Sequence, residues 1–112
     1  MTAPRQYKDF TPRMGIYRVS HLPSGRTLLG HSLHLEGMLN RIRFQLQNGL
    51  HPDKALQADW KADGPAAFSF EVLDEITPKN PGDEPVDDLK ELLTLWQEKL
   101  NLPPAQLYSR RG

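Results

Sequence analysis

Apolar and polar positions follow a strand-like pattern in three places along the chain. Large and β-branched side chains at 14–19 favour a strand, and 27–30 is typical of a strand that returns after a turn at 21–25. In 67–73, Phe68, Phe70 and Val72 share one side of a third strand, because side chains alternate along a strand. The pattern therefore predicts a β-hairpin and one strand far from it in the sequence.

A helical period follows the hairpin. The apolar residues of this segment fall on one helical face: Leu35, Met38, Leu39, Ile42 and Leu46. Ser32 is expected to cap the start of this helix, and Gly49 is expected to end it. Asp53 is expected to cap a second, shorter helix, which turns Ala55, Leu56 and Trp60 inward.

A third helix is expected after a loop at 77–85, which contains three prolines and one glycine. Pro85 suits its first turn, and Asp87 and Asp88 favour its positive end. The order is thus β-β-α-α-β-α, an α+β fold with a small three-stranded antiparallel sheet flanked by helices. We expect the domain at 14–102, a flexible arm at 1–13 and a tail at 103–112 that is frayed from Leu107 onward.

Composition adds limits to this picture. The chain has 112 residues and no cysteine, so it fits one domain without disulfides, thiolate metal sites or cysteine nucleophiles. No apolar run reaches the roughly 18 residues of a membrane span. Residues 1–10 also lack the apolar core of a signal peptide, and we therefore expect a cytoplasmic protein without a membrane partner.

The formal net charge of zero hides an uneven distribution. Residues 1–54 contain 8 Lys or Arg and 3 Asp or Glu, whereas residues 55–112 contain 6 and 11. The first half therefore carries a net charge of +5 and the second half −5. An anionic partner is expected on the basic half.

A short motif lies in the predicted hairpin. The tripeptide Gly15-Ile16-Tyr17 is followed, thirteen residues after the tyrosine, by Gly30. This arrangement resembles the opening of the GIY-YIG nuclease superfamily, and the helix end at 46–51, the second helix and the third strand follow in the same order. The resemblance covers about 14–100 and implies metal-assisted hydrolysis of a nucleic-acid phosphodiester, with Mg²⁺ or Mn²⁺ as cofactor.

The resemblance also implies roles for individual residues. Tyr17 matches the first motif tyrosine, a candidate general base, and His51 matches a histidine that helps to move protons. The other expected groups are replaced by apolar residues: Leu28 for the second tyrosine, Met38 for the arginine and Leu93 for the metal-binding glutamate. Arg41, at i+3 from Met38, and Glu91 are the nearest substitutes for the arginine and the metal ligand.

The incomplete set leaves several functions open. The first is a nuclease that uses Tyr17, either Arg41 or Arg43, His51 and Glu91. The second is an inactive member of the fold that binds DNA or RNA through basic residues of the first half, namely Arg18, Arg26, Arg41, Arg43 and Lys54. The third is a domain that binds a protein partner through its acidic last helix. Each candidate residue also has an ordinary alternative, as a packed strand aromatic or a solvated surface charge.

Overall fold

The computed structural model describes residues 13–80 and 82–108. It contains three strands and three longer helices in the predicted order β-β-α-α-β-α. The elements are β1 (Met14–His21), β2 (Thr27–Ser32), α2 (Leu35–Gln47), α3 (Lys54–Asp63), β3 (Phe68–Ile76) and α4 (Val86–Leu100). Two short 3-10 helices, η1 (Pro65–Ala67) and η2 (Pro104–Gln106), complete it. The predicted α+β fold is confirmed.

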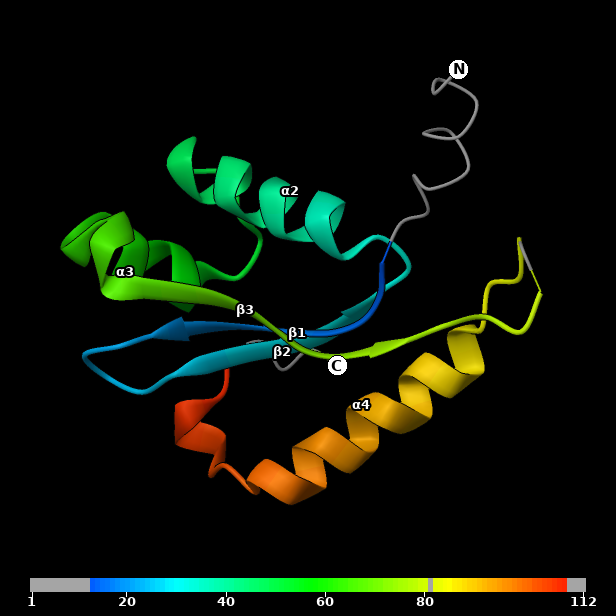
Figure 1. The fold of residues 1–112 in the computed structure, drawn as a ribbon. Helices are drawn as coiled ribbons and strands as arrows, with labels where there is room; N and C mark the ends of the chain where they lie inside the picture. Colours follow the sequence, from blue (N-terminus) through cyan, green and yellow to red (C-terminus); the bar gives the residue numbers. More distant parts are fainter. Residues whose placement is uncertain (1–12, 81, 109–112) are drawn as a thin grey trace, which may run out of the picture.

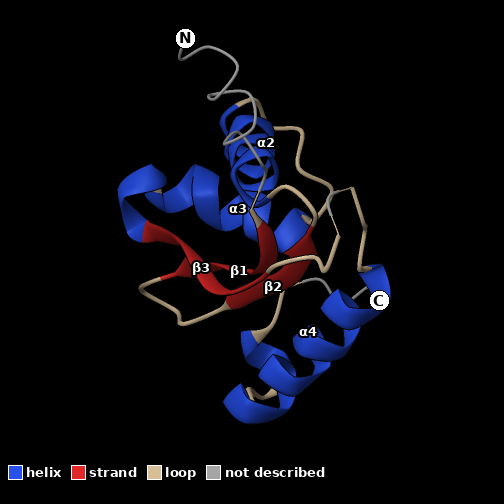
Figure 2. Cartoon of the chain, turned by 45° about the vertical axis from the view of Figure 1, so that its right-hand side comes forward, coloured by secondary structure: helices blue, strands red, loops and turns tan. Residues whose placement is uncertain are grey.

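The three strands form one antiparallel sheet in the order β2-β1-β3. In the hairpin, Tyr17 lies opposite Gly30, and Val19 lies opposite Leu28. The pairing of β1 with β3 shifts between Ile16 and Tyr17, which marks a bulge. Helices α2 and α3 lie on one side of the sheet and α4 on the other (Figures 1 and 2).

The largest core lies on the α2/α3 side. It joins buried residues from the sheet, both helices and the end of the chain: Tyr17, Val19, Leu35, Ile42, Leu46, Leu56, Trp60, Phe68 and Tyr108. Ile16 and Leu89 are also fully buried but lie outside this cluster. Because Ile16 and Tyr17 are adjacent in a strand, their side chains point to opposite faces, and the sheet is covered on both sides.

Helix starts show one confirmed and one wrong prediction. The Asp53 side chain accepts a hydrogen bond from the Leu56 backbone N–H at 3.0 Å, as a helix cap does. The predicted Ser32 cap is wrong, because α2 begins two residues later, with His34 at the cap position and no side-chain cap bond. Ser32 Oγ instead accepts from the His34 N–H at 2.9 Å, in the turn before the helix. Ala55 is exposed rather than inward.

Both ends of the described chain are attached to the domain. Arg13, placed in the predicted arm, bonds Glu36 and Glu75 at 2.6 Å each. Tyr108, predicted to be frayed, is only 4% exposed, and its backbone N–H donates to the Thr27 carbonyl at 2.8 Å. The rest of the predicted arm and the end of the tail, 1–12 and 109–112, lie outside the described residues.

None of the described helices is both long enough and apolar enough to cross a bilayer.

Candidate functional site

The two motif glycines are positions where a side chain has no room. A Cβ on Gly15 would lie 1.9 Å from the Asp74 backbone oxygen, and a Cβ on Gly30 would lie 2.4 Å from the Tyr17 hydroxyl. The Tyr17 ring therefore lies over the bare backbone of Gly30 on the neighbouring strand. Both glycines of the motif thus serve the packing of the hairpin and of the β1–β3 pair.

Tyr17, the predicted general base, belongs to the buried core. It is 8% exposed, and Leu28 and Met38 pack against the same cluster. Burial raises the pKa of the Tyr17 hydroxyl above its usual value of 10.0. A base must be deprotonated to accept a proton, and this environment leaves a smaller fraction of Tyr17 deprotonated at neutral pH than of an exposed tyrosine.

The two arginines of α2 have different surroundings. Arg41 is exposed, and no hydrogen bond or ion pair of its guanidinium is found within the described residues. Arg43 is half-buried, with its guanidinium 4.2 Å from the centre of the Phe70 ring, and it donates to Asn40 Oδ1 at 3.3 Å. Arg41 therefore presents its charge to solvent, while Arg43 also holds α2 to the edge strand β3.

His51 lies in the loop between α2 and α3. Its Nδ1 accepts from the Asp53 N–H at 3.0 Å, a contact that favours the neutral ring with its proton on Nε2. Burial lowers the pKa of His51, although Asp53 acts in the opposite direction. Gln57 completes this loop, because its side chain joins the His51 N–H to the Leu46 carbonyl at 3.0 and 2.9 Å.

Three other basic residues had been predicted to bind nucleic acid, and two of them are paired within the fold. Arg18 bonds Glu71 across the sheet at 2.5 Å, and Arg26 bonds both carboxylate oxygens of Asp59 at 2.8–3.1 Å. A paired guanidinium offers a phosphate less net charge than a free one. Lys54 is exposed at the start of α3.

Sequence reasoning missed a polar cluster at the tip of the hairpin. His21 is buried, with Nδ1 2.7 Å from Ser24 Oγ and Nε2 2.7 Å from Asp63 Oδ2. Next to it, Asp59 accepts from both Arg26 and the Tyr108 hydroxyl. Burial tends to raise the pKa of Asp59, but these two donors outweigh it and the pKa is lowered. The only signal in the sequence is the i, i+4 spacing of the two aspartates on α3.

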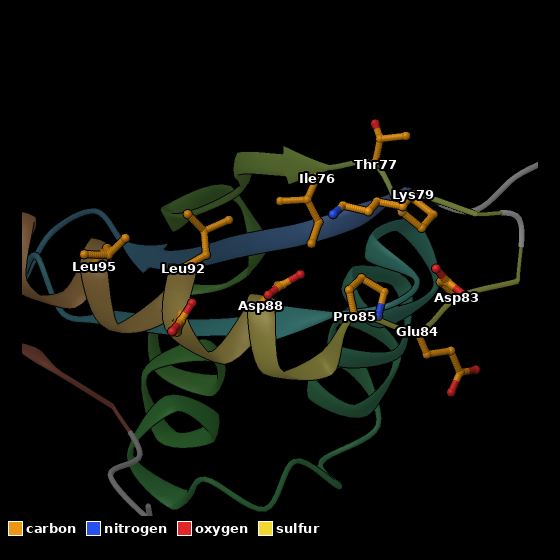
Figure 3. Close-up of a pocket in the computed structure, with 11 residues that line it drawn as sticks. Ile76, Thr77, Lys79, Asp83, Glu84, Pro85, Asp88, Leu92 and Leu95 are labelled. Atoms are coloured by element: carbon orange, nitrogen blue, oxygen red, sulfur yellow. The ribbon is translucent and has the colours of Figure 1, made fainter.

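Glu91, the predicted metal ligand, lies on α4 and therefore on the other side of the sheet from Tyr17 (Figure 2). It lines a cleft of about 700 Å³ between the end of β3, the following loop and α4 (Figure 3). The walls combine apolar side chains with four carboxylates and one ammonium group; the residues are Ile76, Thr77, Pro78, Lys79, Asp83, Glu84, Pro85, Asp88, Glu91, Leu92 and Leu95.

The residues around Tyr17 do not fit a divalent cation. Mg²⁺ and Mn²⁺ prefer oxygen ligands, but Leu28 and Met38 occupy the motif positions beside the Tyr17 cluster. Within residues 13–80 and 82–108, no group of three or more His, Cys, Asp or Glu side chains could hold a metal ion. The structure thus brings Tyr17, Met38 and Leu28 to one core, and leaves Glu91 away from it.

Comparison with known proteins agrees with the fold. No model of a protein family matches the chain, and no curated protein does. Two solved structures of the catalytic domain of the homing endonuclease I-TevI, an intron endonuclease, do match. One has a TM-score of 0.69 and 23% sequence identity, and the match covers 88% of this chain and 99% of the endonuclease domain. The other, a point mutant, has a TM-score of 0.68 and 24% identity, and covers 87% and 92%. At this identity the likeness concerns the fold: the chain has the GIY-YIG fold.

Proposed function

We propose that this chain is a nucleic-acid-binding domain of the GIY-YIG fold that binds without cutting. The observation that carries this proposal is the replacement of the motif's polar groups by a packed apolar core around Tyr17. Tyr17 is buried, which raises its pKa, and Leu28 and Met38 beside it offer no oxygen ligand to a cation and no guanidinium to a phosphorane.

Binding itself is supported by the charge of the α2 surface. Residues 37–52 contain Arg41, Arg43 and His51 and no Asp or Glu. Lys54 follows directly at the exposed start of α3. Phosphate groups are attracted to such a surface, and the fold likeness is to the catalytic domain of an enzyme whose name states action on nucleic acid.

The test measures binding and cleavage with the full chain. Fluorescence anisotropy with a labelled 20-nucleotide strand and with its duplex, between 50 and 200 mM salt, should show affinity that falls with salt. Three cationic contacts give a slope of about −2 to −3 in log K against log[salt]. An affinity without a salt slope would contradict the proposed phosphate contacts.

Cleavage is tested by incubating the chain with supercoiled plasmid and with small RNAs, with and without Mn²⁺. We expect no nicking above the buffer control. If the wild-type chain cuts and the Tyr17→Phe variant does not, the chain is a nuclease and the proposal is wrong.

The acidic cleft supports a second candidate, a protein partner. Its four carboxylates beside Leu92 and Leu95 suit a basic side chain carried by an apolar segment (Figure 3). A peptide that alternates arginine and leucine should bind the chain, and Glu91→Gln should weaken this binding. Equal affinity for wild type and variant would exclude the cleft as the binding surface.

A further inference from the structure

The outer surface of α2 carries an exposed aromatic ring. Phe44 is 60% exposed, whereas the apolar residues of the opposite side of the helix, such as Ile42 and Leu46, are buried. Around Phe44, at helical neighbour positions i−4, i−3 and i+3, lie Asn40, Arg41 and Gln47, all exposed. We call these four residues the Phe44 stripe. The stripe is not part of the Tyr17 core.

The chemistry of the stripe favours a nucleotide over an apolar protein surface. Its only charged member is cationic, and no Asp or Glu occurs in 37–52. Its other members, Asn40 and Gln47, carry amides that both donate and accept hydrogen bonds, as the edges of nucleobases require. Arg41 lies about 5–6 Å from Phe44 along the helix surface, which suits one nucleotide whose base meets the ring and whose phosphate meets the guanidinium.

We propose that Phe44 stacks on an unpaired base, so that the domain selects single-stranded or unpaired nucleic acid over a continuous duplex. This proposal rests on the proposed function and narrows it to a substrate class. A helix-borne ring reaches the face of a base inside a duplex only if a base step is first unstacked at a cost in free energy, whereas a base in a single strand, a loop or a frayed end is already open to stacking. The stack is sequence-tolerant because every base has a π-face.

The experiment compares Phe44 variants on a labelled 20-nucleotide DNA strand, the matching RNA strand and the 20-base-pair DNA duplex. Phe44→Ala should weaken binding of the single strands by about 5- to 150-fold, the effect of losing one base–aromatic stack. Binding of the duplex should change less than about twofold. Phe44→Trp should retain single-strand affinity, whereas Phe44→Leu, which keeps apolar area without the π-face, should lose most of it.

Leu95→Ala provides the matched control. Leu95 is also 60% exposed but lies on α4, among the carboxylates of the cleft, and its removal should leave nucleic-acid affinity unchanged. Phe44 makes no part of the core, so its variants should unfold at the wild-type temperature. The salt slope should also stay the same in Phe44→Ala, because no charge is removed.

Three results would overturn the inference in different ways. If the wild-type chain binds single strands and Phe44→Ala or Phe44→Leu binds them equally well, base stacking is wrong and the proposed function stands. If the wild-type chain binds neither strand nor duplex, the proposed function fails and the stacking inference fails with it. A wild-type preference for duplex would also exclude the unpaired-base selection.

Discussion

The two sides of the sheet carry opposite chemistry. On the α2/α3 side, a continuous apolar core lies beneath α2, whose outer surface from residue 37 onward has Arg41 and no carboxylate. On the α4 side, a helix with one fully buried residue, Leu89, borders a cleft lined by four carboxylates. The net charge of zero thus hides a basic stretch along α2 and an acidic cleft beside α4.

The comparison of the two sides also separates the residues of the GIY motif from the other residues that were expected to act in catalysis. The motif glycines and Tyr17 build the hairpin and its packing, whereas Leu28 and Met38 pack against the core and Glu91 lies across the sheet. The following predictions test two points. The first is whether the α2/α3 core contributes most of the free energy of unfolding, and the second is whether the outer surface of α2 binds anions.

The largest effect is expected from Tyr108, which closes the α2/α3 core from the end of the chain. Tyr108→Ala should lower the free energy of unfolding by about 3–5 kcal/mol, as for other large buried aromatics. Tyr108→Phe removes only the hydroxyl that bonds Asp59 and should cost about 1.5–3 kcal/mol. Urea denaturation followed by tryptophan fluorescence measures both. A change below 1 kcal/mol in Tyr108→Ala would show that the core closes without the tail.

Gly30→Ala should have the next largest effect. The added Cβ meets the ring of Tyr17, whose Cζ would be 2.5 Å away, and overpacking of this kind costs about 1–3 kcal/mol. Gly37→Ala, on α2 with its nearest side-chain atom at 3.6 Å, should instead stabilise the chain by about 0.5–1 kcal/mol through helix propensity. Melting curves of the pair compare them directly. A neutral Gly30→Ala would mean that Tyr17 is free to move.

Arg41→Gln tests which surface binds nucleic acid. Loss of one phosphate contact should raise the dissociation constant about fourfold near 0.1 M salt and make the salt slope less negative by about 0.7–0.9. Lys90→Gln removes the same charge from the exposed surface of α4 and should have no such effect. Anisotropy titrations give both numbers. Equal losses in the two variants would indicate a general charge effect and no specific surface.

The smallest effect concerns His51 and pH. Its pKa is lower in the folded chain than the usual 6.5, so the unfolded chain takes up the proton first as the pH falls. The stabilisation that the neutral His51 ring contributes is complete above the pKa of His51 in the unfolded chain. It is lost as the pH falls through the pKa of His51 in the folded chain. His51→Asn should therefore flatten the decrease of melting temperature between pH 7 and pH 5. An imidazole pKa at or above 6.5, measured by NMR titration, would contradict this.

Much of the fold could be predicted because it follows from local patterns. The strand alternation, the helical face from Leu35 to Leu46 and the Asp53 cap all depend on residues close together in sequence. The end of β3 was predicted three residues too early, because its last residues, Asp74 and Glu75, are polar. Their strand conformation depends on pairing with Ile16 and Gly15 of β1.

The candidate site was harder to predict because the pairing and burial of its side chains depend on residues that lie far away in the sequence. Arg18 and Arg26 look like free cations in the sequence, but Glu71 and Asp59 neutralise them from positions 53 and 33 residues away. Tyr108 looked like part of a frayed tail, since Thr27 and Asp59, which hold it, lie far upstream. Arg41 remained a candidate because no such partner lies beside it in the described part of the chain.

The end of the described chain also lies along the outermost strand of the sheet. Leu107 forms a parallel bridge with Thr27 of β2, next to the Tyr108 bond to the same residue. An outer strand with free backbone groups is a template on which other chains can add as further strands, the first step of ordered aggregation. By occupying one end of β2, the last described residues block part of that template. Loss of Leu107 and Tyr108 would therefore expose an aggregation-prone edge of β2 and would also loosen the α2/α3 core.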